Sequence, residues 1–250
     1  MPDYRFSVET DLDRQALGAI LARYRPFRVE VAFSNGFNTR EFGDDVPYAT
    51  PEPLAKLHYF GAALEIGPWT RMLDIGSHLG YYGHHFLRAG IGRYVGVEPD
   101  MRLFGGATFL QVLSSYPRER MRFAHLDFGA PGALEVLRAQ GPFDAVLALA
   151  SLNNIRSLTA ALDNMAALAA PGAQLVLEYL ALDTDEPRLT FHAGGYRGDT
   201  TLHWAFSQSF LDAYLGRHDI ARDRVLLDWE KAEVIGAGMK KIMALYRKPA

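Results

Sequence analysis

The chain has 250 residues, of which 49% are hydrophobic and 22% charged, values usual for a soluble globular domain. Its formal net charge of -3 gives no overall attraction to nucleic acid or anionic membranes, although it leaves room for a local basic groove. The lack of cysteine excludes disulfides and thiolate chemistry. Because we find no signal peptide and no apolar run long enough to cross a bilayer, we expect a cytoplasmic protein without membrane contact.

The first 50 residues predict an extension made of a helix and a hairpin. Apolar residues recur at helical spacing between Asp11 and Tyr24. Residues 27–33 then alternate apolar and polar, which is typical of a half-buried strand. The turn signal Ser34-Asn35-Gly36 predicts a return strand at 37–42. We expect this extension to act as a cap, within the same domain, on residues 51–250.

From residue 51 onward, short apolar segments alternate with helical ones. This alternation predicts an α/β fold with a Rossmann-like, seven-stranded, mostly parallel sheet, an antiparallel C-terminal strand and helices on both faces. Strands are expected at 72–74, 94–97, 121–126, 143–149, 174–178, 224–229 and 241–247. Helices are expected at 50–66, 80–89, 102–115, 133–140, 157–169 and 207–216.

The segment Met72-Leu73-Asp74-Ile75-Gly76-Ser77-His78-Leu79-Gly80 is the most informative stretch of the chain. It reads as a strand, a tight glycine turn and the start of a helix, the first half of a nucleotide-binding βαβ unit. Glu98 ends the next strand, where a carboxylate can accept hydrogen bonds from both hydroxyls of a ribose. A dinucleotide fold needs glycine where this chain has His78 and Tyr81, which argues against NAD and FAD.

These motifs resemble those of the class I S-adenosylmethionine-dependent methyltransferases. Asp74, Gly76 and Gly80 match the acidic, glycine-rich first motif of that family, and His78 replaces its middle glycine. Histidine is one of the residue types enriched at positive φ, so the turn can accept it. The resemblance covers residues 51 to 248 and implies S-adenosylmethionine as cofactor and S-adenosylhomocysteine as product.

The resemblance also implies which residues hold the cofactor. Asp127 would accept from the adenine amino group and Phe128 would lie against the ring, although Asp also begins turns and Phe is equally a core residue. The full expected set is Asp74, Gly76, Ser77, His78, Gly80, Glu98, Pro99, Asp127, Phe128, Ala148 and Leu149. We expect these residues to gather at the carboxyl ends of the strands.

A narrower resemblance, to the tRNA wobble-uridine carboxymethyltransferase group, lies in residues 98–104, 175–178 and 203–207. Phe206 stands where that group tends to have proline, and the basic residues of a tRNA groove are not evident. The Asp-Ile-Gly-x-x-x-Gly-Tyr-Tyr pattern is similar to that of sugar- and polyketide-tailoring O-methyltransferases. We therefore expect a small-molecule acceptor, methylated at oxygen, and nucleic acid is the less favoured partner. The alternatives are a tRNA uridine carboxymethyl- or methyltransferase and a non-catalytic S-adenosylmethionine-binding protein.

Residues 183–207 form a long glycine-containing stretch with little periodicity, typical of a lid or substrate loop. It carries the first candidate for a general base, His203, and the second, His192. We expect Trp204 to wall the acceptor pocket, unless it instead anchors the helix that follows. Asn153, after the fourth strand, is a candidate for positioning a substrate oxygen, or else caps a turn. No metal-ligand motif is evident, so we expect no metal.

Overall fold

The computed structural model of the chain describes residues 6–27, 29–43, 56–195, 199–229 and 238–250. These residues form two compact units. Unit 1 comprises residues 1–69 and 77–125, and unit 2 comprises residues 70–76 and 126–250. The expected boundary near residue 50 lies outside the described residues. No helix of the described residues has the length and apolar character needed to span a membrane.

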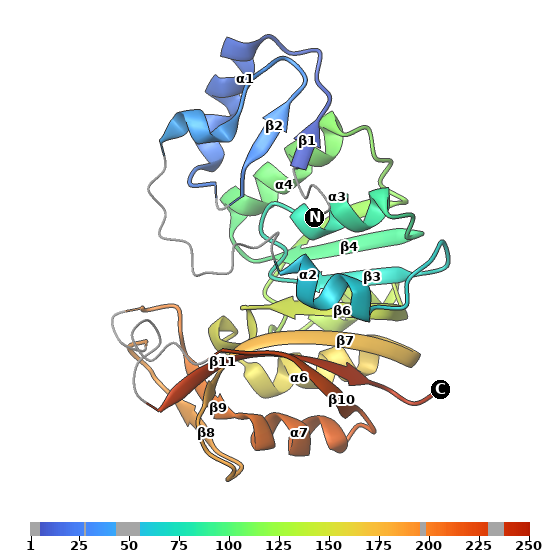
Figure 1. Cartoon of the computed structure of the whole chain (residues 1–250), viewed down its shortest axis with the longest axis vertical. Coiled ribbons are helices and arrows are strands. Elements are labelled where there is room, and N and C mark those ends of the chain that lie inside the picture. The colour runs from blue at the N-terminus through green and yellow to red at the C-terminus, as the bar shows by residue number, and fades with distance from the viewer. Residues whose placement is uncertain (1–5, 28, 44–55, 196–198, 230–237) are drawn as a thin grey trace. The chain divides into compact units, whose positions relative to one another are not determined.

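Unit 1 contains the N-terminal elements and one βαβ segment. Its elements in chain order are β1 (Phe6–Val8), α1 (Arg14–Leu21), η1 (Ala22–Tyr24), β2 (Val31–Phe33), η2 (Thr39–Phe42), α2 (Leu57–Phe60), η3 (Gly61–Ala63), α3 (Tyr81–Arg88), β4 (Arg93–Glu98), α4 (Met101–Leu113) and β5 (Met121–His125). Strands β4 and β5 pair in parallel, and β1 pairs in parallel with β2. Figure 1 shows α1, β1 and β2 grouped together within this unit.

The N-terminal elements share one hydrophobic core with helices α3 and α4. Asp13 caps the start of α1 by accepting from the backbone N–H groups of Gln15 and Ala16, so the helix begins there. The apolar face predicted for residues 27–33 is buried, as expected. This core contains Phe6, Val8, Leu17, Leu21, Phe27, Val29, Val31, Phe33, Phe37, Leu79, Tyr81 and Leu110. The extension is therefore part of unit 1.

The predicted return strand at 37–42 is wrong, although the turn before it is confirmed. The backbone of Phe33 accepts from Gly36, and a single antiparallel bridge joins Ala32 to Asn38. The chain then enters the 3₁₀ helix η2, because Asn38 and Glu41 form a reciprocal capping box. The helix expected at 50–66 is also shorter than expected within the described residues, which hold α2 and η3 only.

Unit 2 contains the other helices and strands of the described residues. Its elements are β3 (Arg71–Ile75), α5 (Ala133–Arg138), β6 (Phe143–Leu149), η4 (Leu152–Asn154), α6 (Leu158–Leu168), β7 (Ala169–Leu182), β8 (Leu189–Phe191), β9 (Trp204–Ser207), α7 (Gln208–Gly216), β10 (Ala221–Trp229) and β11 (Met239–Arg247). Strand β6 pairs in parallel with both β3 and β7. Strand β11 pairs antiparallel with β7 and β10. The chain thus has the predicted α/β, Rossmann-like fold with a mostly parallel sheet and an antiparallel C-terminal strand.

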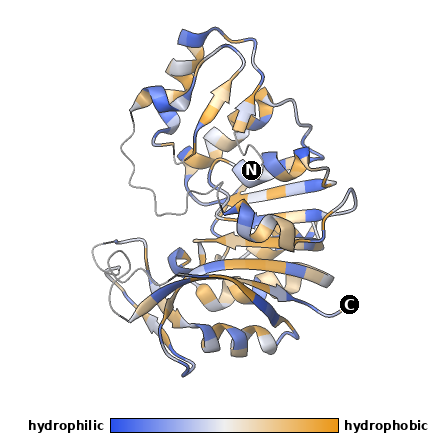
Figure 2. Ribbon diagram, viewed as in Figure 1, coloured by the Kyte–Doolittle hydropathy of each residue, from blue (hydrophilic) through white to orange (hydrophobic). Residues whose placement is uncertain are grey.

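The central strands of unit 2 are apolar along most of their length, as Figure 2 shows for β6. Burial of β6 on both faces explains its continuous run of apolar residues from Ala145 to Leu149, which an exposed strand would not need. One charged pair lies within this buried layer: Lys241 Nζ lies 2.6 Å from Glu178 Oε1. Removing the lysine would leave a buried carboxylate without that cation, at a typical cost of about 3–5 kcal/mol.

The prediction of an irregular segment at 183–207 is partly wrong. Strands β8 and β9 pair antiparallel, and β9 also pairs in parallel with the end of β7. Ser207 then caps α7 by accepting from the backbone N–H of Phe210. These two strands of three and four residues are additional to the seven predicted. Both ends of the segment are therefore tied to the sheet of unit 2.

Candidate functional site

The glycine turn adopts the backbone that its sequence predicts. Gly76, His78 and Gly80 have φ values of 76°, 52° and 77°. Residues that carry a Cβ atom rarely adopt such positive φ values, whereas glycine adopts them without strain. The tolerance predicted for histidine at this turn is confirmed by the backbone of His78. A Cβ atom at Gly80 would overlap the ring of Phe123, so the start of α3 requires glycine for space as well.

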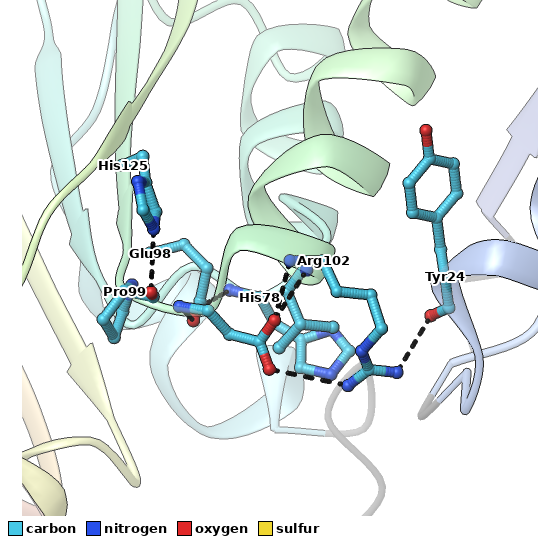
Figure 3. Close-up of polar contacts among 8 residues, drawn as sticks. Tyr24, His78, Glu98, Pro99, Arg102 and His125 are labelled. Carbon is cyan, nitrogen blue, oxygen red and sulfur yellow. Dashed lines mark hydrogen bonds and ion pairs between the residues drawn. The ribbon is translucent and has the colours of Figure 1, made fainter.

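The carboxylate of Glu98 is held beside this turn, within unit 1. Its Oε2 accepts from the backbone N–H of His78 at 2.8 Å, and its Oε1 accepts from that of Asp100 at 3.0 Å. Figure 3 shows Glu98 together with His78 and with Arg102 of α4. The backbone N–H of Ser77 donates to Val97 at 3.0 Å, which fixes the turn against the end of β4. Each oxygen of Glu98 thus accepts one backbone hydrogen bond, and a carboxylate oxygen can accept two.

Burial controls the protonation of this carboxylate. Glu98 is 6% exposed, and burial raises its pKa above the ordinary value of 4.5. The backbone N–H groups of Asp100 and His78 act in the opposite direction, because they stabilise the charged form. The group is thus poised as a desolvated hydrogen-bond acceptor, in which each bond to a ligand gains strength from the low local dielectric.

Pro99 and Arg102 extend this cluster towards β5 and the N-terminal elements of unit 1. The ring Nε2 of His125 lies 2.9 Å from the carbonyl oxygen of Pro99. Arg102 donates to the carbonyl of Tyr24 at 3.4 Å and lies 3.6 Å from the carboxylate of Asp100 (Figure 3). The expected contacts Ser77, His78, Gly80, Glu98 and Pro99 are therefore brought together in unit 1.

Unit 2 carries the other end of the glycine turn. Asp74 is 1% exposed in β3, in register with Leu147 of β6. A Cβ atom at Gly76 would lie 2.8 Å from Cβ of Ser151, which follows β6 closely in the chain. The hydroxyl of Ser151 is buried and has no hydrogen-bond partner among the described residues. Ser151 is thus an additional candidate at the strand end where Ala148 and Leu149 lie.

The structure gives Asp127 and Phe128 definite local contacts. Asp127 is exposed, and its Oδ1 accepts from the backbone N–H of Gly129 at 2.9 Å, so it begins a turn. Phe128 is 2% exposed, and its carbonyl accepts from the side chain of Asn164 in α6. The carboxylate of Asp127 retains acceptor capacity beyond its turn bond, so its expected contact with adenine stays a prediction.

The candidate catalytic residues of unit 2 lie around the end of β6 and the start of β9. Asn153 is 2% exposed and joins β7 to β9. Its amide nitrogen donates to the carbonyls of Leu180 and Trp204, and its amide oxygen accepts from the N–H of Leu180, all at 2.9–3.0 Å. Both donors of Asn153 are thus engaged by backbone atoms. The N–H of His203 donates to the carbonyl of Asn153 at 2.9 Å.

His203 presents a ring nitrogen that the fold does not use. Its Nδ1 is buried and has no hydrogen-bond partner among the described residues. Its carbonyl accepts from the N–H of His192 at 2.7 Å, so the two candidate bases are joined through the backbone. Trp204 instead donates its indole N–H to the carbonyls of Ile155 and Arg156, at 2.9 and 3.1 Å. The indole therefore helps to hold β9 in place.

Replacing His78 with Gly tests whether the turn needs a side chain there. We expect folding and S-adenosylhomocysteine affinity to change little, because glycine adopts positive φ freely and the bond to Glu98 comes from the backbone. Thermal unfolding should show a loss of no more than about 1 kcal/mol. The control is His78→Val, whose β-branched side chain strains this backbone and should weaken binding. Loss of turnover with intact binding in His78→Gly would instead reveal a chemical role for the imidazole.

Comparisons with known proteins identify the family of this chain. The family model described as a methyltransferase domain matches residues 37–220. The chain is 30% identical, over 177 residues, to a tRNA U34 carboxymethyltransferase of Syntrophotalea carbinolica, covering 71% of this chain and 50% of that protein. It is 32% identical, over 115 residues, to the enzyme of the same name from Dichelobacter nodosus, covering 46% of this chain and 34% of that protein. The chain therefore spans half or less of the length of these two relatives.

Solved structures share the fold at low sequence identity. The N-terminal domain of EvdMO1, solved in the presence of SAH and D-fucose, has a TM-score of 0.67 and 17% identity, with 99% of this chain and 100% of that chain covered. The SAH-bound magnesium protoporphyrin IX methyltransferase of Synechocystis PCC 6803 has a TM-score of 0.55 and 15% identity, with 84% and 92% covered. With the family match across most of its length, the chain belongs to the methyltransferase domain family and has the fold of the class I S-adenosylmethionine-dependent enzymes.

Proposed function

We propose that this chain binds S-adenosylmethionine and transfers its methyl group to an oxygen atom of a small-molecule acceptor. The observation that carries the cofactor assignment is the Glu98 carboxylate, fixed by two backbone N–H groups beside the turn at positive φ. A carboxylate so placed fits the two hydroxyls of a ribose, and glycine at positions 76 and 80 lets the adjacent turn keep its positive φ values without strain. The bound cofactor supplies an activated methyl group, so the protein has to position the acceptor and accept its proton.

On the acceptor side, we propose His203 as the general base, with His192 as the second candidate. The support for His203 is its buried Nδ1 without a partner among the described residues. We assign Asn153 a positioning role, because its amide holds β7 and β9 and its carbonyl holds the backbone of His203. The buried hydroxyl of Ser151 is a further group that can bind the cofactor or acceptor.

A small acceptor fits the charge of this region better than RNA does. Residues 183–207 carry four carboxylates and two guanidinium groups, a balance that repels a phosphate backbone. The names of the curated relatives favour the second candidate, a tRNA uridine-modifying enzyme. In each of these relatives, at least half of the sequence lies outside the segment that matches this chain.

A methyl-transfer screen separates the candidate functions. Purified protein is incubated with methyl-labelled S-adenosylmethionine and either a panel of hydroxylated small molecules or bulk tRNA. We expect label in the small-molecule fraction, and its loss in the His203→Ala variant. Label in tRNA would establish the RNA function instead. Tight S-adenosylhomocysteine binding without transfer to either panel would favour a non-catalytic binding protein.

The raised pKa of Glu98 predicts a pH dependence of cofactor binding. The pKa of Glu98 lies above its ordinary value of 4.5. Affinity for S-adenosylhomocysteine should be full at pH values above this raised pKa and should fall as the pH drops through it. The reason is that a protonated carboxylic acid is a poorer hydrogen-bond acceptor than a carboxylate. The stability of the free protein should respond in the opposite sense. Burial lets the folded state hold the proton more tightly, so the contribution of Glu98 is present below its unfolded pKa and is lost as the pH rises.

Calorimetric titrations with S-adenosylhomocysteine, from pH 4.5 upward through the raised pKa, check the pH dependence of affinity. Thermal unfolding of the free protein over the same pH range checks the pH dependence of stability. The matched variant is Glu98→Gln, which keeps the shape of the side chain and removes its titration. Its affinity should be lower at neutral pH and nearly flat with pH. A wild-type affinity that stays constant over this pH range would exclude Glu98 from the binding site.

A further inference from the structure

A cavity lies in unit 1, between helix α4 and the edge strand β5. Its volume is about 420 Å³, within the usual range for small-molecule sites. Its walls are formed by Arg93, Phe104, Thr108, Gln111, Arg118, Glu119, Arg122 and Phe123. Arg93 opens β4 and Glu98 closes it, so this arginine stands about 16 Å along the strand from the ribose-binding carboxylate. The basic end of the cavity is therefore separate from the cofactor turn.

The charges around this cavity are unbalanced. Three guanidinium groups and one carboxylate line it, in a chain whose overall charge is negative. Arg118 and Arg122 are exposed, and the structure gives neither of them a hydrogen bond or ion pair among the described residues. Arginines that converge on one cavity repel each other, and an anion bound between them would relieve that repulsion. Guanidinium groups match phosphate in geometry because their N–H groups bind two oxygens at once.

The remaining walls suit a flat apolar group. The ring centroids of Phe104 and His125 are 5.5 Å apart, and those of Phe123 and Tyr94 are 5.9 Å apart. Each phenylalanine ring therefore packs against a neighbouring ring. Gln111 is 5% exposed and donates to the carbonyl of Met121 at 2.8 Å, which fixes α4 against the start of β5. The cavity is thus built on regular elements and combines a cationic end with aromatic sides.

We propose that this cavity binds a nucleoside phosphate, with Arg118 and Arg122 on the phosphate and Phe104 beside the base. The phosphate belongs either to a free nucleotide or to the end of an RNA strand, since both present the same chemistry. The evidence for this site does not rest on the proposed methyl transfer. A ligand here would act as a regulator or as a second point of attachment for an acceptor.

Calorimetry with cytidine monophosphate tests the proposal. Saturating S-adenosylhomocysteine is present throughout, so that the nucleotide cannot enter the cofactor site. We expect binding of cytidine monophosphate, and at least about tenfold weaker binding of uncharged cytidine. We expect the Arg118→Gln/Arg122→Gln variant to lose about tenfold or more in affinity for the nucleotide. The matched control is Arg138→Gln, an exposed arginine at the end of α5 in unit 2, which should bind as the wild type does.

Thermal unfolding and S-adenosylhomocysteine affinity establish that each variant is folded. Arg122→Lys serves as a second variant, because it keeps the charge and loses the two-pronged geometry, and it should bind the nucleotide more weakly than the wild type. No binding to the wild type, equal binding of cytidine, or unchanged affinity in the double variant would each overturn the proposal.

A 5′-phosphorylated pentanucleotide distinguishes the two sources of the phosphate. If it binds more tightly than the mononucleotide, and the double variant reduces the dependence of its affinity on salt, the phosphate of an RNA strand is the ligand. If it binds no more tightly, the free nucleotide is the ligand. Because S-adenosylhomocysteine binding is measured on the same samples, failure of this proposal is distinguishable from failure of the methyltransferase assignment.

Discussion

Replacing Gly76 with Val should abolish S-adenosylhomocysteine binding. The backbone at Gly76 has a φ of 76°, where a β-branched residue is strained by roughly 1–3 kcal/mol. Its Cβ would also lie 2.8 Å from Cβ of Ser151, so one of the two chain segments has to move. Either movement displaces the turn that we assign to the cofactor tail. Calorimetry should show no binding at ligand concentrations that saturate the wild type, and the melting temperature should fall.

The control for this variant is Gly172→Val in the same unit. Gly172 has nearly the same φ, 77°, and a Cβ atom there would meet nothing within 4 Å. Both variants therefore carry similar backbone strain, and only the first disturbs the cofactor turn. We expect Gly172→Val to bind S-adenosylhomocysteine normally. The double variant Gly76→Ala/Ser151→Gly should bind better than Gly76→Ala alone, because it removes the clash. Normal binding by Gly76→Val would exclude this turn from the site.

Replacing His203 with Ala should lower turnover by roughly a hundredfold or more, the usual size of a general-base contribution. The backbone bonds of His203 to Asn153 and His192 do not involve its side chain, so the variant keeps them. Cofactor affinity and melting temperature should therefore stay close to those of the wild type. Turnover is measured on the acceptor found in the screen, across a range of pH.

Two further variants distinguish a general base from a structural residue. His192→Ala should retain more turnover than His203→Ala, since His192 is the second candidate. Trp204→Ala should instead lower stability, because it removes the indole N–H from the carbonyls of Ile155 and Arg156 and the contact with the ring of Phe191. Full activity in His203→Ala would rule out this base and leave the proton to His192 or to solvent.

The buried strands and the glycine turn could be predicted from the sequence because their signals are local. Residues 145–149 of strand β6 form a continuous apolar run, and His78 belongs to a residue type that tolerates positive φ. The 3₁₀ helix after Asn38 also had a local signal, since Glu41 stands at the capping-box spacing, but the alternation of apolar residues obscured it.

Other features depend on contacts between distant parts of the chain. Strands β8 and β9 are too short to show a period, and their place depends on the amide of Asn153, 51 residues before Trp204. Ser151 lies beside Gly76 because β3 pairs with β6. No local sequence pattern predicts which strands pair. The cavity beside α4 brings together arginines from β4, from β5 and from the loop before β5. Each of these required the structure.

Calorimetric titration with S-adenosylhomocysteine, with NADH as the competing nucleotide, tests the cofactor assignment most directly. We expect S-adenosylhomocysteine to bind and NADH not to bind, because His78 and Tyr81 occupy positions where a dinucleotide needs glycine. We also expect Glu98→Ala to bind S-adenosylhomocysteine at least about tenfold more weakly, equivalent to about 1.4 kcal/mol. Tighter binding of NADH than of S-adenosylhomocysteine by the wild-type protein, or unchanged affinity in Glu98→Ala, would contradict the cofactor assignment.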